Sequence, residues 1–293
     1  MAQLKLSDTN GIVACNTVIV DGPVSDVKDI ERSIIKKFRK QLWTPFIKGV
    51  KEFEMIADGD RIAVCISGGK DSLLLAKLLQ EMQKHSTTKF ELEFIAMNPG
   101  FNDANYEMLV SSCKDLGIEV DVFKTEIFAI VEKIAKDYPC YMCARMRRGA
   151  LYEYAQSKGC NKIALGHHYT DFNETVLMNV LYGGNYKAMM PKVKAKNYDN
   201  MELIRPMVYV HEDDIIRYTK HNNIRAMNCG CVVAANKTSS KRAEVKQLIK
   251  DLKTINPDVE KSIFASTKNV TTSSILGWND NGHKTSFLDE YNN

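Results

Sequence analysis

The stretch Ile62-Ala63-Val64-Cys65-Ile66-Ser67-Gly68-Gly69-Lys70-Asp71-Ser72-Leu73-Leu74-Leu75 decides the fold of this chain. It begins with an apolar run of strand length, breaks at two glycines among hydroxyl and charged side chains, and resumes with leucines at helical spacing. This order predicts a strand, a tight loop and a helix. Glycines let the backbone approach a ligand closely, and the first amides of a helix attract anions.

Hydroxyl, ammonium and carboxylate groups are concentrated in residues 67–72. Ser67 and Ser72 add hydroxyl donors, Lys70 adds a positive charge, and Asp71 could hold Mg²⁺ against phosphate oxygens. An ordinary turn between a strand and a helix needs none of these groups, so their concentration favours a phosphate-binding loop. The loop has neither the Walker A spacing nor that of G-x-G-x-x-G.

Further strands are expected at 90–97, 118–123, 162–168 and 203–206, with helices at 104–116, 211–222, 241–255 and 258–267 and one that begins near Asp171. Residues 185–202 are expected to form a polar loop, and the last twenty residues are expected to be partly disordered. Alternating strands and helices predict a doubly wound parallel α/β sheet, whose ligands bind at the carboxyl ends of strands. His167, His168 and Asp171 should therefore lie at the same edge as the 67–72 loop. Asp171 could be only a helix cap, but the fold should aim it at a nucleotide. Of the adjacent His167 and His168, at least one is expected to be structural.

The chain has 293 residues, 44% of them hydrophobic, a formal charge of +4 and a pI near 8.5. No apolar run reaches the length of a membrane span, and no signal peptide is visible, so we expect a cytoplasmic protein without a membrane partner. The mildly basic charge permits a nucleic-acid partner without requiring one.

Residues 26–57 have apolar side chains at steps of three and four, which predicts a helix, or a pair of helices broken before Pro45. The other side of this segment is basic. Its cations could simply be solvated, or they could contact an RNA backbone. They are Arg32, Lys36, Lys37, Arg39, Lys40, Lys48 and Lys51.

Eight cysteines without a signal peptide favour reduced thiols. Cys15, Cys65, Cys113 and Cys160 are scattered and are expected to be bystanders. The remaining four form two groups: a C-x-x-C, Cys140 and Cys143, which precedes Arg145, Arg147 and Arg148, and the pair Cys229 and Cys231. Three thiolates would leave one iron of a four-iron cluster open, four would close a zinc or cluster site, and a C-x-x-C alone could be a redox pair. The residues alone leave these alternatives open.

The hexapeptide 67–72 resembles the pyrophosphate loop (PP-loop) of the N-type ATP pyrophosphatases, which adenylate a carbonyl or amide oxygen. Other motifs resemble the tRNA 2-thiocytidine synthetase family, over about residues 30 to 275. These motifs are Cys140-x-x-Cys143-Ala-Arg-Met-Arg-Arg-Gly-Ala-Leu-Tyr, Lys162-Ile-Ala-Leu-Gly-His-His, Leu181-Tyr-Gly-Gly-Asn-Tyr-Lys-Ala-Met, Ile204-Arg-Pro and Ile263-Phe-Ala-Ser-Thr-Lys-Asn-Val.

The resemblance implies ATP, Mg²⁺ and a [4Fe-4S] cluster as cofactors, with the cluster held by Cys140, Cys143 and Cys229. The family has a second C-x-x-C where this chain has Cys229-x-Cys231. The third ligand is therefore either Cys229 or Cys231, and Cys229 is favoured. The family's two adjacent acids are replaced by Thr170-Asp171, which leaves Asp171 to assist adenylation. Arg147 is expected near the base and Arg145 and Arg148 on the RNA. The implied ATP-binding residues are Ser67, Gly68, Gly69, Lys70, Asp71, Ser72, Met97, Gly166 and His167, with Lys70 also stabilising the departing pyrophosphate.

The expected domains are a leader and basic helix at 1–57, a PP-loop domain with the cluster site at 58–235, and C-terminal helices and a tail at 236–293. The implied function is an ATP-dependent tRNA sulfurtransferase that adenylates the C2 oxygen of a pyrimidine, favoured to be cytidine because the zinc modules of related uridine enzymes are missing. Its partners would be tRNA and a sulfur donor, sulfide or a cysteine desulfurase, and a homodimer stays open. The alternatives are a PP-loop enzyme that adenylates another tRNA base or a small molecule, with zinc on the cysteines, and a nucleotide-binding redox regulator.

Overall fold

A computed structural model gives the fold, and it describes residues 20, 22–128, 130, 139–227, 239–280 and 282–291. The chain divides into two compact units. The first comprises Met1–Phe172 and Met190–Glu244, and the second comprises Asn173–Met189 and Val245–Asn293. Since each unit has its own internal contacts, they are described separately.

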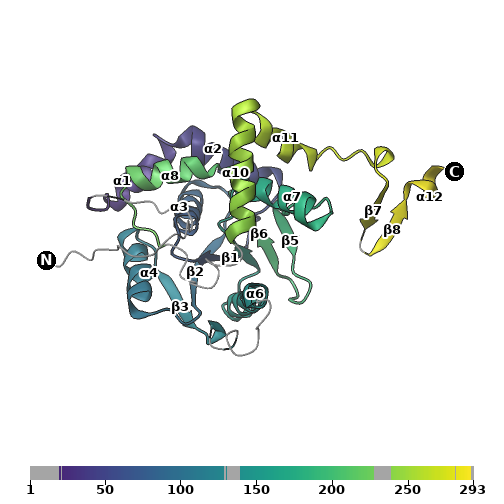
Figure 1. The fold of residues 1–293 in the computed structure, drawn as a ribbon. Coiled ribbons are helices and arrows are strands. Elements are labelled where there is room, and N and C mark those ends of the chain that lie inside the picture. The colour runs from purple at the N-terminus through teal and green to yellow at the C-terminus, as the bar shows by residue number, and fades with distance from the viewer. Residues whose placement is uncertain are drawn as a thin grey trace. The chain divides into compact units, whose positions relative to one another are not determined.

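The first unit contains a six-stranded sheet in the order β3-β2-β1-β4-β6-β5 (Figure 1). Its strands are β1 Arg61–Ile66, β2 Glu91–Asn98, β3 Val120–Lys124, β4 Lys162–Ala164, β5 Lys192–Lys194 and β6 Glu202–Ile204. All pairs are parallel except β5 with β6, which is antiparallel. The predicted doubly wound α/β sheet is confirmed. The prediction of a plain loop at 185–202 is wrong, because this stretch contains the edge strand β5.

Helices that follow the predicted pattern connect these strands. In the first unit they are α3 Lys70–His85, α4 Asp103–Asp115 and α6 Pro139–Ser157, and α8 Glu212–His221 follows β6, the last strand of the sheet in chain order. Helices α7 Tyr169–Gly183 and α10 Ser239–Ile255 begin in the first unit and continue into the second.

The two faces of β1 pack against different helices. Ala63 and Cys65 belong to a buried cluster with Tyr152 and Ala155 of α6. Successive side chains of a strand alternate between faces, so Val64 and its neighbours point to the opposite face, where α3 contacts β1. The carboxyl ends of the central strands therefore lie between α3 on one face of the sheet and α6 on the other.

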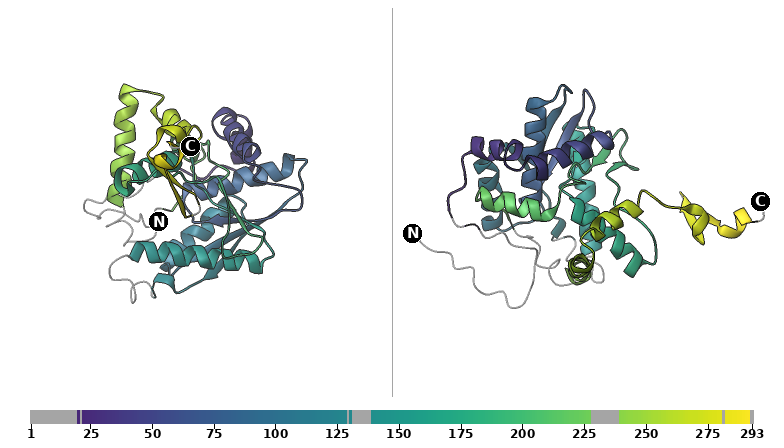
Figure 2. Two further views of the ribbon diagram at one scale, coloured as in Figure 1. Left: turned by 90° about the vertical axis from the view of Figure 1, so that its right-hand side faces the viewer. Right: turned by 90° about the horizontal axis from the view of Figure 1, so that it is seen from above.

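The N-terminal segment forms α1 Val27–Ile35, the π-helical turn η1 Arg39–Trp43 and α2 Thr44–Glu52. The predicted pair of helices broken before Pro45 is confirmed: α1 ends at Ile35, a turn at 36–38 and η1 follow, and Pro45 occupies the first turn of α2. A proline is tolerated there, since the first amides of a helix have no partner within it. In the right view of Figure 2 these purple helices lie beside α8, and Phe38 packs edge-on against Tyr218 of α8.

The second unit contains the α7 residues from Asn173, most of α10, and α11 Val259–Ser266. A hairpin of β7 Gly277–Asp280 and β8 His283–Ser286 follows the 3-10 turn Thr272–Ser274, and α12 Phe287–Tyr291 comes last. The helices expected at 241–255 and 258–267 are confirmed, and much of the last twenty residues, which were expected to be partly disordered, forms this hairpin and α12. Among the described residues, no helix combines the length and apolar character needed to cross a bilayer.

Candidate active site

The loop between β1 and α3 is tightly packed around its glycines. Gly68 has φ +79°, and a Cβ at this position would lie 2.5 Å from the sulfur of Met227. The amide of Met227 donates a hydrogen bond to the Gly68 carbonyl at 2.8 Å. Gly69 is the N-cap of α3 and provides no side chain to cap it. The first amides of α3 therefore lack the capping group that a serine or aspartate would supply, as suits an anion site.

The two loop serines stabilise this conformation. The Ser72 hydroxyl donates to the Gly69 carbonyl at 2.9 Å and accepts from the Ser67 amide at 3.1 Å. The hydroxyls of Ser67 and Ser72 are also 3.1 Å apart. The Ser72 hydroxyl thus joins the two ends of the loop, Ser67 and Gly69, by hydrogen bonds.

A cavity of about 470 Å³ opens at the carboxyl edge of the sheet. This volume lies within the range of small-molecule sites. It brings together most of the predicted site residues: Ser67, Asp71, Ser72, Met97, Gly166, His167, Asp171, Arg147 and Arg148. Lys70 and Arg145 are not among its lining residues, and Arg145 is exposed on α6. Gly68 and Gly69 belong to the loop itself.

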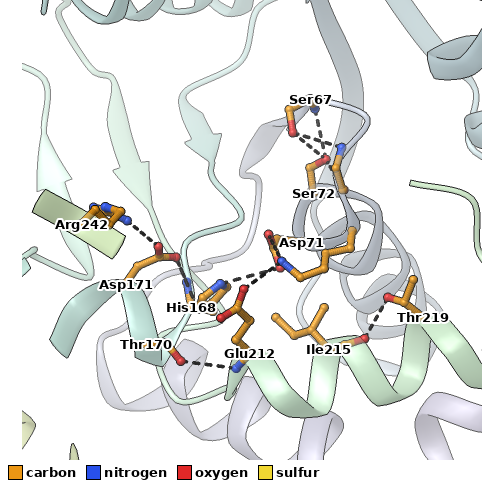
Figure 3. Close-up of polar contacts among 12 residues, drawn as sticks. Ser67, Asp71, Ser72, His168, Thr170, Asp171, Glu212, Ile215, Thr219 and Arg242 are labelled. Carbon is orange, nitrogen blue, oxygen red and sulfur yellow. Dashed lines mark hydrogen bonds and ion pairs between the residues drawn. The ribbon is translucent and has the colours of Figure 1, made fainter. Parts of the chain in front are cut away.

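Two carboxylates, those of Asp71 and Glu212, hold the ammonium group of Lys70, and Figure 3 labels both acids. The Nζ of Lys70 lies 3.1 Å from Asp71 Oδ2 and 3.2 Å from Glu212 Oε1. Burial opposes the charge of Lys70, but the two carboxylates outweigh burial and raise the pKa of Lys70. Lys70 therefore stays an ammonium and fixes the carboxylate of Asp71.

His168 continues this network to the second predicted carboxylate (Figure 3). Its Nε2 lies 3.7 Å from Asp71 Oδ1 and its Nδ1 lies 3.4 Å from Asp171 Oδ2. Asp171 Oδ2 also accepts the His168 amide at 3.0 Å, and its Oδ1 accepts from Arg242 Nη1 at 2.9 Å. A network of ion pairs and polar contacts thus runs from Glu212 to Arg242 through Lys70, His168 and both site carboxylates.

The ionisation of the cavity wall follows from this network. Burial alone would raise the pKa of Asp171, but His168, His167 and Arg242 outweigh it and hold that pKa below its ordinary value. Burial lowers the pKa of His167 to about 4. At neutral pH the cavity therefore presents an ionised Asp171 beside a neutral His167.

Arginines give the cavity a positive wall. Arg147 and Arg148 reach it from α6 and Arg242 reaches it from α10, whereas Arg205, which follows β6, is not among its lining residues. Burial, together with the charge of Arg148, lowers the pKa of Arg205 to about 10, so Arg205 stays charged at neutral pH. Such a wall suits a polyanionic ligand.

The predicted cluster ligands are only partly described. Cys143 is half-buried on α6 and packs against Met97 and Ile127. Cys140 begins the same helix, but its side chain lies outside the described residues, as do Cys229 and Cys231.

The cysteines that were predicted to be bystanders have thiols with raised pKa values wherever the structure describes them. Burial raises the pKa of the Cys65 thiol to about 12, that of Cys113 to about 12 and that of Cys160 to about 11, which makes them poor metal ligands. Cys15 is outside the described residues.

Sequence reasoning missed three members of the charged network. At least one of His167 and His168 was expected to be structural and His168 was given no role in the site, Glu212 was only the acidic start of a helix, and Arg242 was one cation on a predicted helix. Glu212 pairs with a residue 142 positions away and Arg242 with one 71 positions away. No local sequence pattern can reveal contacts between residues so far apart in the chain. Only the pair of adjacent histidines indicated that a member of this network lies near the site.

Comparisons with known proteins agree with this geometry. A family model described as a PP-loop domain matches residues 36–228. The tRNA-cytidine(32) 2-sulfurtransferase of Citrifermentans bemidjiense is 36% identical over 225 residues, which cover 76% of this chain and 88% of the relative. The protein of the same name from Geotalea daltonii is 35% identical over 250 residues, which cover 84% and 96%.

The fold also resembles that of a solved tRNA-modifying enzyme. The U34-tRNA thiolase NcsA from Methanococcus maripaludis, solved with its [4Fe-4S] cluster, has a TM-score of 0.64 at 21% identity. The match covers 88% of this chain and 87% of that protein, and at this identity it shows the fold alone. On the family model and the curated relatives together, the chain belongs to the PP-loop family and, within it, to the family of the tRNA-cytidine(32) 2-sulfurtransferases.

Proposed function

We propose that this protein uses ATP and a [4Fe-4S] cluster to replace the C2 oxygen of a tRNA cytidine with sulfur. One observation carries the proposal: a single cavity is lined by the phosphate loop, by Asp171 and by arginines of the helix that begins with the C-x-x-C. The names of the curated relatives favour cytidine as the base.

The chemistry requires activation because the C2 oxygen of a pyrimidine is a poor leaving group. The oxygen attacks the α-phosphorus of ATP, and the P–O bond to pyrophosphate breaks. A sulfur nucleophile then attacks C2, and the C2–O bond breaks so that AMP departs with the former base oxygen. The amides of the α3 first turn and the charge of Lys70 would stabilise the departing pyrophosphate.

Asp71 fits the role of holding Mg²⁺ against the triphosphate. It lines the cavity from the first turn of α3. Its Oδ1 is buried and has no hydrogen-bond partner within the described part of the chain, while Oδ2 is held by Lys70. A buried carboxylate oxygen aimed at a nucleotide cavity is the donor that Mg²⁺ prefers.

The donor set of α6 fits a cluster at the same cavity. Cys143 packs against Met97, and Met97 lines the cavity. Cys140 precedes Cys143 by three positions, so one helix would present both thiolates. We propose Cys229 as the third ligand and Cys231 as the alternative. With three thiolates, the cluster would supply an open iron position for sulfur.

Asp171 and Arg147 are proposed to act on the base. The network of His168 and Arg242 keeps Asp171 ionised and oriented, so it can accept a hydrogen bond as the base is adenylated. Arg147 would face the charge that develops between phosphate and base, while Arg145 and Arg148 would contact the RNA backbone. Gly166 lets the β4 loop approach α3, since a Cβ there would lie 3.1 Å from the Ser72 amide.

An anaerobic thiolation assay tests this proposal. Protein reconstituted with iron and sulfide is incubated with tRNA, ATP and Mg²⁺, and the digested nucleosides are analysed by mass spectrometry. We expect 2-thiocytidine in amounts equal to the AMP formed, and none with Asp71→Asn. Thiouridine as the product would assign another base. Zinc in place of iron, with tRNA-independent exchange between ATP and pyrophosphate, would favour a small-molecule adenylating enzyme.

A further inference from the structure

The positive charge of this chain is concentrated in one short segment. From Arg32 to Lys51 the sequence has seven cationic side chains and no Asp or Glu. The whole chain has 40 cations against 36 acids, so the remainder carries 33 cations against 36 acids and a formal charge of −3. The net basicity of the protein therefore resides in this segment.

The buried side of the segment repeats every four residues. Ile30, Ile34, Phe38, Leu42, Phe46 and Val50 are all between 0 and 8% exposed. On a regular α-helix a four-residue repeat would drift by about 40° at each step. The wider turn around η1 absorbs this drift, beginning with the hydrogen bond from the Phe38 amide to the Ser33 carbonyl five positions back.

The cations follow the same four-residue repeat on the opposite side. Arg32, Lys36, Lys40 and Lys48 lie two positions from the buried side chains, about 200° around the helix, and all four are exposed. Because the buried row stays on one side, this cationic row stays on the other. Its ends, Arg32 and Lys48, are sixteen positions apart, roughly 24 Å at helical rise. Lys37, Arg39 and Lys51 flank it and are exposed as well.

Within the described residues, no carboxylate neutralises the cations of this row through an ion pair. None of the seven cations, the three flanking ones included, is ion-paired with a carboxylate in the part of the chain that the structure describes; Lys37 contacts His221, and Lys48 lies over the ring of Tyr209. Like charges four residues apart, such as Arg32 and Lys36, disfavour a helix. An unpaired cationic row along one helical face matches the regular negative charge of a phosphodiester backbone.

We propose that the cationic row of Arg32, Lys36, Lys40 and Lys48 is a second RNA-contact surface, which holds the tRNA backbone while the target base enters the cavity. The proposal rests on the proposed tRNA function and adds a surface outside the catalytic cavity. These contacts do not read sequence, since phosphates carry none. Their expected signature is the salt dependence of binding.

The test measures the tRNA dissociation constant of the full-length reconstituted protein at several salt concentrations. Replacing all four residues with glutamine keeps helix-forming residues but removes four charges. Each lost phosphate contact lowers the slope of log affinity against log salt by about 0.7 to 0.9, so we expect the slope to fall by about 3. The ATP affinity and Tm should stay unchanged, which shows that the variant is folded.

The matched control removes the same charge elsewhere, by replacing the exposed Lys89, Lys114, Lys250 and Lys284 with glutamine. The control should keep the wild-type slope. If the row variant keeps the wild-type slope, or if both variants lose it equally, the row is not an RNA-contact surface. A wild-type protein that binds no tRNA would overturn this proposal and the proposed function together, whereas normal tRNA binding with an unchanged slope overturns only the row.

Discussion

Replacing Gly68 with alanine tests the packing of the phosphate loop against a matched control. Gly68 and Gly59 have nearly the same positive φ, +79° and +82°. A Cβ at Gly68 would lie 2.5 Å from the Met227 sulfur, whereas a Cβ at Gly59 would meet nothing within 4 Å. The two substitutions therefore share the backbone strain and differ in the steric clash.

The expected magnitudes follow from these contacts. Left-handed strain costs each variant about 1–2 kcal/mol. Overpacking against Met227 adds about 1–3 kcal/mol for Gly68→Ala alone. At roughly 2–4 °C per kcal/mol in a unit of this size, Gly68→Ala should melt roughly 2–12 °C below Gly59→Ala.

The same pair separates stability from nucleotide binding. If the shifted loop loses two hydrogen bonds to phosphate, each of about 1.5 kcal/mol, ATP affinity falls about 100-fold in Gly68→Ala and stays unchanged in Gly59→Ala. Differential scanning calorimetry and titration calorimetry measure the two effects. Equal melting temperatures would refute the packing argument, and wild-type ATP affinity in Gly68→Ala would refute the role of the loop amides.

Three further predictions concern the charged network and the cysteines. The wild-type protein should be more stable than Asp171→Asn, fully so at neutral pH and less so as the pH falls below about 4, because folding lowers the pKa of Asp171. A difference in urea unfolding that does not change with pH would contradict this. His168→Ala should lower kcat by about 10-fold or more with little change in KM for ATP, because His168 positions two carboxylates. His168→Gln should recover part of the lost kcat. If kcat and the affinity for ATP fall together and glutamine does not rescue them, His168 is merely structural. Cys143→Ala should lose iron after anaerobic reconstitution while Cys160→Ala retains it, and iron retention in both would remove Cys143 from the cluster.

Local patterns predicted the fold where the chemistry is local. The glycines and periodic leucines around Ser67 specified β1, the loop and α3, and the order of strands and helices specified which strand ends meet. Because parallel strands share a carboxyl edge, His167 and Asp171 could be placed beside the loop before their contacts were known.

Long-range pairing explains most of what sequence reasoning missed. Strand β5 is three residues long within a polar stretch and exists through its pairing with β6, which no period within 185–202 could show. The place of the interruption, at 36–38, follows from the need to keep a four-residue apolar row on the core, and that need is a property of the packed segment. Lys70 was predicted as a group facing pyrophosphate, and its observed pairing with Glu212 depends on where α8 packs.

Oxygen tracing tests the central claim, adenylation of the base oxygen, most directly. A tRNA carrying oxygen-18 at C2 of the target cytidine is thiolated by the reconstituted protein, and the AMP is analysed by mass spectrometry. The proposed chemistry predicts one oxygen-18 atom in each AMP, in an amount equal to the 2-thiocytidine formed. Unlabelled AMP together with labelled water would show that the oxygen leaves without adenylation, and would contradict the account.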